Sequence, residues 1–236
     1  MYSYKGRIRF SETDEELKLK VNRLIDYFQD AALFEAEDGK MTMKYLQSRK
    51  LAWLLGAWQV EIVRRPRLGE RVEITTIPYQ FKGFLGNRNF YMKTEEGELL
   101  AYANSVWSLM DMEHLTPFRP TEEILNGYEI GEKIDMEYKP RKIQLGDNPQ
   151  EMEKITVGMH QLDSNQHMNN AEYVTIAMGF LPKDAEVKEV RVEYKMAAYY
   201  KDVIIPVIYA QQNKMQIKLQ NEEQKTYAVI EFGYEK

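Results

Sequence analysis

The chain of 236 residues contains no cysteine. This absence excludes disulfide bonds, a thiolate nucleophile and metal sites with cysteine ligands. No run approaches the roughly eighteen apolar residues that a membrane-spanning helix needs. Charge of positive sign is also in deficit, since the net charge is −5, so neither nucleic acid nor an anionic membrane is an expected partner.

The composition that is present is typical of a soluble globular protein, with 44% hydrophobic and 29% charged residues. The length allows one large domain or two small ones. The polar, alternating segment Met1–Phe10 is unlike a signal peptide, so we expect a cytoplasmic location.

The same order of predicted strands and helices occurs twice along the chain. In the first copy, the alternating segment Tyr4–Phe10 precedes a polar stretch and then a helix with apolar residues at helical spacing. A second helical piece is predicted at Thr42–Arg49. Strands are predicted at Trp53–Val63, Arg71–Pro78, Asn87–Thr94 and Leu99–Asp111, with a hairpin turn at Gly97.

The second copy repeats this order from a strand at Glu153–His160 and a helix at Ala171–Phe180. Its later strands are predicted at Val187–Ala197, Val203–Gln211, Met215–Gln220 and Thr226–Tyr234. The segment between the copies is rich in proline and charge. We therefore predict an α+β chain of two helix-wrapped antiparallel sheets, with domains at 1–120 and 150–236 and a linker at 121–149.

The polar segment His160–Asn170 is the most informative part of the chain, with two of its three histidines. Aligning the copies at this segment gives an offset of 149 residues, the difference between 163 and 14, so that Asp163 matches Asp14. Asn165 then matches Glu16, and His167 matches Lys18. A purely structural motif would look alike in both copies, so the asymmetry favours function for Asn165 and His167.

Three uses of the segment are physically reasonable. Asn169 or Asn170 is suited to cap the following helix, with Glu172 completing a capping box. Asp163, Asn165 and His167 suit acid–base chemistry beside a helix N-terminus, where free N–H groups stabilise an oxyanion. A polar loop with a satisfied histidine is the bland alternative. The spacing of His160, Asp163 and His167 fits no known metal motif, so no metal site is predicted.

The run Asp163–Tyr173, which reads D-S-N-Q-H-M-N-N-A-E-Y, closely resembles the signature of acyl-acyl carrier protein (acyl-ACP) thioesterases. The resemblance extends over most of the chain, through Trp58–Gly69, Ser105–Asp111 with Pro117, and Val192–Tyr194. It implies a tandem hotdog fold, with Asp163, Asn165 and His167 as the catalytic acid, amide and imidazole.

One departure from the family pattern concerns the strand after Val192–Tyr194. Plant members carry Glu-Cys there and many bacterial members keep the Glu, whereas this chain has Ala197 and Ala198. Without cysteine, a Cys-His-Asn triad cannot operate. Glu193 lies on the same strand face but roughly 13 Å away along the strand, which makes it a poor substitute.

The resemblance implies hydrolysis of acyl-ACP to free fatty acid, in fatty acid biosynthesis, without a cofactor. It places the acyl chain in the first half, where Trp53 and Trp58, with Asn169 at the motif, are candidate substrate-binding residues. Arg64, Arg65 and Arg67 are candidates for docking the acidic carrier protein, although a solvated basic face is the simpler interpretation. The chain is expected to be a monomer or a homodimer.

Other functions remain open from the sequence. An acyl-CoA thioesterase would use the same residues on a different thioester. A non-catalytic acyl-thioester-binding hotdog protein is favoured slightly by Ala197. A hydratase or dehydratase is weaker, because no acid partner is evident.

Overall fold

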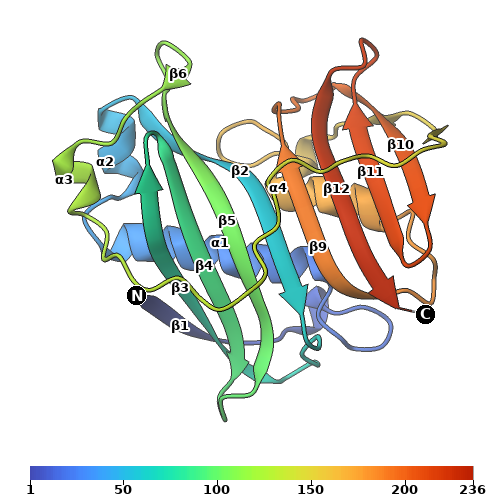
Figure 1. Cartoon of the computed structure of the whole chain (residues 1–236), viewed down its shortest axis with the longest axis horizontal. Coiled ribbons are helices and arrows are strands. Elements are labelled where there is room, and N and C mark those ends of the chain that lie inside the picture. The colour runs from blue at the N-terminus through green and yellow to red at the C-terminus, as the bar shows by residue number, and fades with distance from the viewer. Residues whose placement is uncertain (236) are drawn as a thin grey trace. The chain divides into compact units, whose positions relative to one another are not determined.

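A helix packed on an antiparallel sheet occurs twice along the chain in the computed structural model, which describes residues 1–235 (Figure 1). The first compact unit comprises Met1–Gly56 and Ile62–Lys139, and the second comprises Ala57–Glu61 and Pro140–Lys236. The predicted α+β class is confirmed. The domain bounds stay a prediction: residues 121–139 belong with the first unit and residues 140–149 with the second.

The first unit wraps its sheet around one long helix. The sheet order is β1-β3-β4-β5-β2, with β6 paired to the far end of β5. The elements are β1 Tyr2–Arg7, the 3-10 turn η1 Phe10–Glu12, α1 Val21–Asp38, α2 Met43–Ser48, β2 Leu51–Ile62, β3 Arg71–Lys82, β4 Leu85–Thr94, β5 Leu99–Asp111, β6 Thr116–Pro117 and α3 Glu122–Leu125.

The apolar stripe of α1 explains why the helix lies on the sheet. Leu24, Phe28 and Ala31 are fully buried, and the Phe28 ring lies 5.3 Å from that of Phe90 on β4. Phe34, at the end of the stripe, is partly exposed and packs edge-on against Tyr4 of β1. The helix thus buries its apolar face over most of its length.

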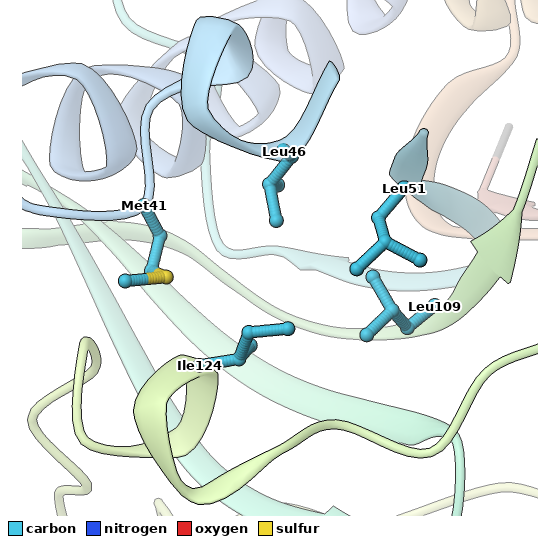
Figure 2. Close-up of a cluster of buried hydrophobic side chains, with 5 residues drawn as sticks. All are labelled: Met41, Leu46, Leu51, Leu109 and Ile124. Atoms are coloured by element: carbon cyan, nitrogen blue, oxygen red, sulfur yellow. The ribbon is translucent and has the colours of Figure 1, made fainter. Parts of the chain in front are cut away.

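A second apolar cluster closes one end of this unit (Figure 2). Five buried side chains from α2, α3, β2, β5 and the segment before α2 point toward one another: Met41, Leu46, Leu51, Leu109 and Ile124. Trp53 packs against the cluster, and its indole N–H donates to the Tyr128 hydroxyl at 3.0 Å. The short helices α2 and α3 are therefore held by packing rather than by their own length.

The second unit repeats the design with a shorter helix. Its sheet order is β9-β12-β11-β10-β7, and Ala57–Glu61 of β2 pairs with β9 inside this unit. The elements are β7 Gln150–Glu151, β8 Ile155–Thr156, the 3-10 turn η2 Met159–Gln161, α4 Asn170–Met178, β9 Glu186–Tyr194, β10 Val203–Gln211, β11 Lys214–Gln220 and β12 Thr226–Glu235.

Two predicted strands are shorter than expected. The strand predicted at Glu153–His160 is reduced to β8, because the chain turns at η2, where the polar segment begins. The strand predicted at Val187–Ala197 ends at Tyr194, since Lys195 and Met196 both donate their N–H groups to the Tyr227 carbonyl instead of continuing the ladder.

The segment 140–146 crosses one face of the second sheet, while α4 covers the other (Figure 1). It is fastened there by polar contacts in addition to the buried side chain of Ile143. The Gly146 N–H donates to Gln216 at 2.8 Å, Arg191 donates to the Pro140 carbonyl at 2.6 Å, and Gln216 and Arg191 both donate to the buried Glu231. None of the helices described in residues 1–235 is long and apolar enough to cross a membrane.

Candidate active site

The polar segment forms a tight loop that enters α4. Leu162 and Met168 pair as an isolated bridge, and the Asp163 N–H donates to the His167 carbonyl at 2.8 Å. The Asp163 carboxylate accepts the N–H of Asn165 at 2.8 Å. Gln166 has a φ of 63°, in the left-handed region. This geometry brings Asn165 and His167 close to the beginning of the helix.

The entrance to α1 in the first unit has the same loop. The Asp14 N–H donates to the Lys18 carbonyl at 2.9 Å, its carboxylate accepts the N–H of Glu16 at 2.9 Å, and Leu17 has a φ of 59°. These three features match at the offset of 149 residues, the difference between 163 and 14. Turn closure is therefore a role that both aspartates share.

The two loops differ in the side chains that they present. In the first, the Lys18 ammonium lies 2.7 Å from the Glu16 carboxylate, an ion pair at the surface. In the second, the same two places hold Asn165, which is exposed, and His167, which is half-buried. An amide and an imidazole thus replace a surface ion pair on one backbone frame, and the frame does not require either of them.

The helix entrance also differs. Asn169 is the N-cap of α4, and its side chain accepts the N–H of Ala171 at 2.9 Å. Lys20, its match before α1, has no side-chain cap. The predicted capping role of Asn169 is confirmed, and its side-chain oxygen is engaged there. Its predicted role in binding substrate stays a prediction.

The segment Lys195–Asp202 packs against the loop at a single buried residue. The Ala198 carbonyl accepts the N–H of Met168 at 2.8 Å, and its N–H donates to the Tyr173 hydroxyl of α4 at 2.9 Å. Burial raises the pKa of Tyr173 to about 12, so its hydroxyl stays neutral. Ala198 therefore joins the strand end, the loop and the helix.

The first unit shows which residue matches Ala197 in the other copy. There the Pro66 carbonyl accepts the N–H of Leu19 at 2.8 Å, which matches the Ala198 contact at a second offset of 132 residues, the difference between 198 and 66. Arg65 is thus the match of Ala197, and its guanidinium donates to the second carboxylate oxygen of Asp14. Burial opposes ionisation of Asp14, but the bonds from Arg65 and backbone N–H groups outweigh it and lower the pKa of Asp14. Ala197 has no group with which to hold Asp163 in this way.

Glu193, the substitute considered from the sequence, is engaged elsewhere. Its side chain is buried beneath the segment 140–146, where the Ile143 N–H donates to it at 3.3 Å and the Lys195 ammonium lies 3.6 Å away. The expectation that it is a poor substitute agrees with this position, because its carboxylate is already engaged by a backbone N–H and a cation.

His167 and His114 have different surroundings. The His167 ring packs edge-on against the Tyr199 ring, with centroids 4.9 Å apart and planes at 83°. The His114 Nδ1 lies 2.9 Å from an Asp111 oxygen on an exposed turn. Within residues 1–235, no three histidine, aspartate or glutamate side chains come together as a metal site.

The predicted docking arginines lie in different environments. Arg64 is held by Glu70 and Glu98, and Arg65 is nearly buried against Asp14. Arg67 uses its backbone N–H to bind Glu70.

Trp58 is buried in β2, whereas Trp53 lies at the edge of the apolar cluster. Arg67 is exposed and Trp53 is partly exposed, and their roles in docking and acyl-chain binding stay predictions.

Comparison with known proteins gives consistent relatives. Residues 1–128 match the acyl-ACP thioesterase N-terminal domain and residues 145–236 the C-terminal domain. A chloroplast acyl-[acyl-carrier-protein] hydrolase FATB3 of Cuphea viscosissima is 23% identical over 189 residues, which are 75% of this chain and 46% of that protein. The chain thus spans about half the length of this curated relative.

Two solved structures share the whole fold. An acyl-ACP thioesterase from Bacteroides thetaiotaomicron superposes with a TM-score of 0.90 at 19% identity, over 99% of this chain and 97% of that one. A 12:0-ACP thioesterase from Umbellularia californica gives 0.83 at 18% identity, over 99% and 96%. The tandem hotdog prediction is confirmed. Because both family domains match in order across most of its length, the chain belongs to the acyl-ACP thioesterase family.

Proposed function

We propose that this protein hydrolyses the thioester of an acylated carrier protein and releases a free fatty acid. The observation that carries the proposal is the duplicated entrance loop, in which one copy holds a surface ion pair and the other holds Asn165 and His167. The names of its relatives, which are acyl-ACP hydrolases and thioesterases, support the same reaction.

In the proposed reaction His167 acts as the general base. Its imidazole takes a proton from water, the resulting hydroxide adds to the thioester carbon, and the carbon–sulfur bond then breaks. The proton returns to the departing thiolate, so that acid and thiol are the products. The side-chain amide of Asn165 stabilises the oxyanion, and the positive end of the α4 dipole adds to this effect.

Asp163 has two roles in this proposal. One oxygen closes the turn, as in the first unit, and this fixes the places of Asn165 and His167. The other oxygen meets no arginine from the neighbouring strand end, because Ala197 stands where the first unit has Arg65. We assign this second oxygen of Asp163 to orient the attacking water, because position 197 holds alanine and not a glutamate.

The carrier protein is the proposed partner, and Arg67 is the proposed docking residue of the three arginines. Trp53 is the proposed acyl-chain contact, since it lies at the edge of the apolar cluster of the first unit. The cytoplasmic location and the monomer or homodimer state stay predictions.

The test compares hydrolysis of the carrier-protein thioester and the CoA thioester of the same acyl chain. The comparison is repeated for several chain lengths. The proposal expects higher kcat/KM on the carrier-protein thioester. A higher kcat/KM on the CoA thioester would identify acyl-CoA as the substrate instead. Binding of both thioesters without release of product over hours would show a non-catalytic binding protein.

A further inference from the structure

The segment after β9 presents one aromatic ring to the active-site loop. Tyr199 is 51% exposed, yet its backbone is fixed: its N–H donates to the Asp202 carboxylate at 2.9 Å. Tyr227 also donates its hydroxyl to Asp202, at 3.2 Å, and Lys201 donates its N–H to the Val157 carbonyl at 3.0 Å. An exposed ring on a fixed backbone has a restricted set of positions.

The first unit shows that this contact comes from the frame and not from chance. Its matching residues, Lys18 and Arg67, pair as an isolated antiparallel bridge. By the two offsets, Lys18 matches His167 and Arg67 matches Tyr199. The frame therefore sets these two residues opposite each other in both units, with two cations in one and two aromatic rings in the other.

The contact acts on the side chain that the proposed function uses as a base. The edge-on geometry, at 4.9 Å and 83°, is the favoured arrangement of two aromatic rings. The partner ring restricts rotation of the imidazole about its χ angles. A general base must keep its nitrogen within hydrogen-bond reach of the attacking water, so a restricted ring is an advantage.

We propose that Tyr199 is a positioning residue, whose ring holds the imidazole of His167 in the orientation that proton transfer from water requires. The inference rests on the proposed function. It concerns the ring and not the hydroxyl, because the contact is between ring faces and edges.

The chain offers a matched control in the next residue. Tyr200 is 48% exposed, and its ring faces the Lys201 ammonium at 5.2 Å. Removing it takes away a similar area of exposed aromatic surface from the same segment. Tyr200→Ala therefore separates loss of the His167 contact from general loosening of the segment.

The experiment combines kinetics with NMR of the three histidine rings in Tyr199→Ala, Tyr199→Phe and Tyr200→Ala. His114 and His160 serve as internal references. In Tyr199→Ala we expect the His167 ring signals to lose their ring-current shift, with kcat lowered on the order of 10-fold and KM changed by less than about twofold. Tyr199→Phe should restore both, and Tyr200→Ala should resemble the wild type.

Three results would overturn the inference. The first two are His167 signals that do not move in Tyr199→Ala, and a kcat in Tyr199→Phe as low as in Tyr199→Ala. The third is an equal loss in Tyr200→Ala, since the effect would then belong to the segment. These outcomes differ from failure of the proposed function, in which the wild type itself shows no turnover while the NMR contact remains.

Discussion

At the scale of single residues, two aspartates hold equivalent turns in different electrostatic surroundings. Asp14 binds Arg65 with the oxygen that does not close its turn, whereas Asp163 faces Ala197 at that place. In Asp163→Asn the side-chain oxygen can still accept the Asn165 N–H, so the fold should persist. We expect thermal stability near that of the wild type and kcat lowered by about 10²-fold. Unchanged kcat would restrict Asp163 to closing the turn.

The matching change in the first unit should have the opposite signature. Asp14→Asn removes the anion that partners the nearly buried Arg65, so we expect a loss of about 1–3 kcal/mol in unfolding free energy and normal turnover. Because the folded-state pKa of Asp14 is lowered, its contribution is present above the ordinary aspartate pKa and disappears as pH falls through the lowered value. Urea titrations from neutral to acid pH should show a weaker pH dependence in the variant. An identical pH dependence in both proteins would contradict this assignment.

At the scale of elements, the N-cap of α4 fixes the helix end that the proposed oxyanion site uses. Asn169→Ala should lower the free energy of unfolding by about 1 kcal/mol. Asn169→Asp or Asn169→Ser should retain most of the stability, because each still offers an oxygen to the Ala171 N–H. Lys20→Ala before α1 is the matched control, since Lys20 provides no side-chain cap. Chemical denaturation measures the free energy of unfolding of these four variants. Equal stability of Asn169→Ala and the wild type would contradict the capping role.

The elements also show what the sequence could predict. The period of α1 and the alternation of the long strands predicted these elements, because burial on one face leaves a pattern. The early end of β9 had no such signal: Lys195 and Met196 leave the ladder because both N–H groups turn to the Tyr227 carbonyl. The offset at Asp163 was visible in the sequence, since both copies must close the same turn. Tyr199 was not predicted as a site residue, although the offset of 132 residues that matches it to Arg67 also relates Val190–Tyr194 to Trp58–Ile62 in the sequence.

At the scale of the whole molecule, net charge bears on how the proposed carrier-protein partner would dock. The net charge is −5, so an acidic partner is repelled overall and needs a local basic site. Of the predicted arginines, Arg64 and Arg65 are held by carboxylates of the chain itself, and changing them would disturb the fold. Arg67→Glu should raise KM for the carrier-protein thioester several-fold, and rising salt should reduce this difference, while KM for the CoA thioester changes little. Stopped-flow or steady-state assays at two ionic strengths check this, and an equal effect on both thioesters would contradict docking at Arg67.

The whole-molecule duplication also provides the most direct test of the central claim, that one entrance loop of two carries the chemistry. The measurement is turnover of acyl-carrier protein by His167→Ala and by Lys18→Ala, the same change at matching places on the same backbone frame. We predict a fall of about 10²-fold or more for His167→Ala and near wild-type turnover for Lys18→Ala. Wild-type turnover in His167→Ala, or equal losses in the two variants, would contradict the account.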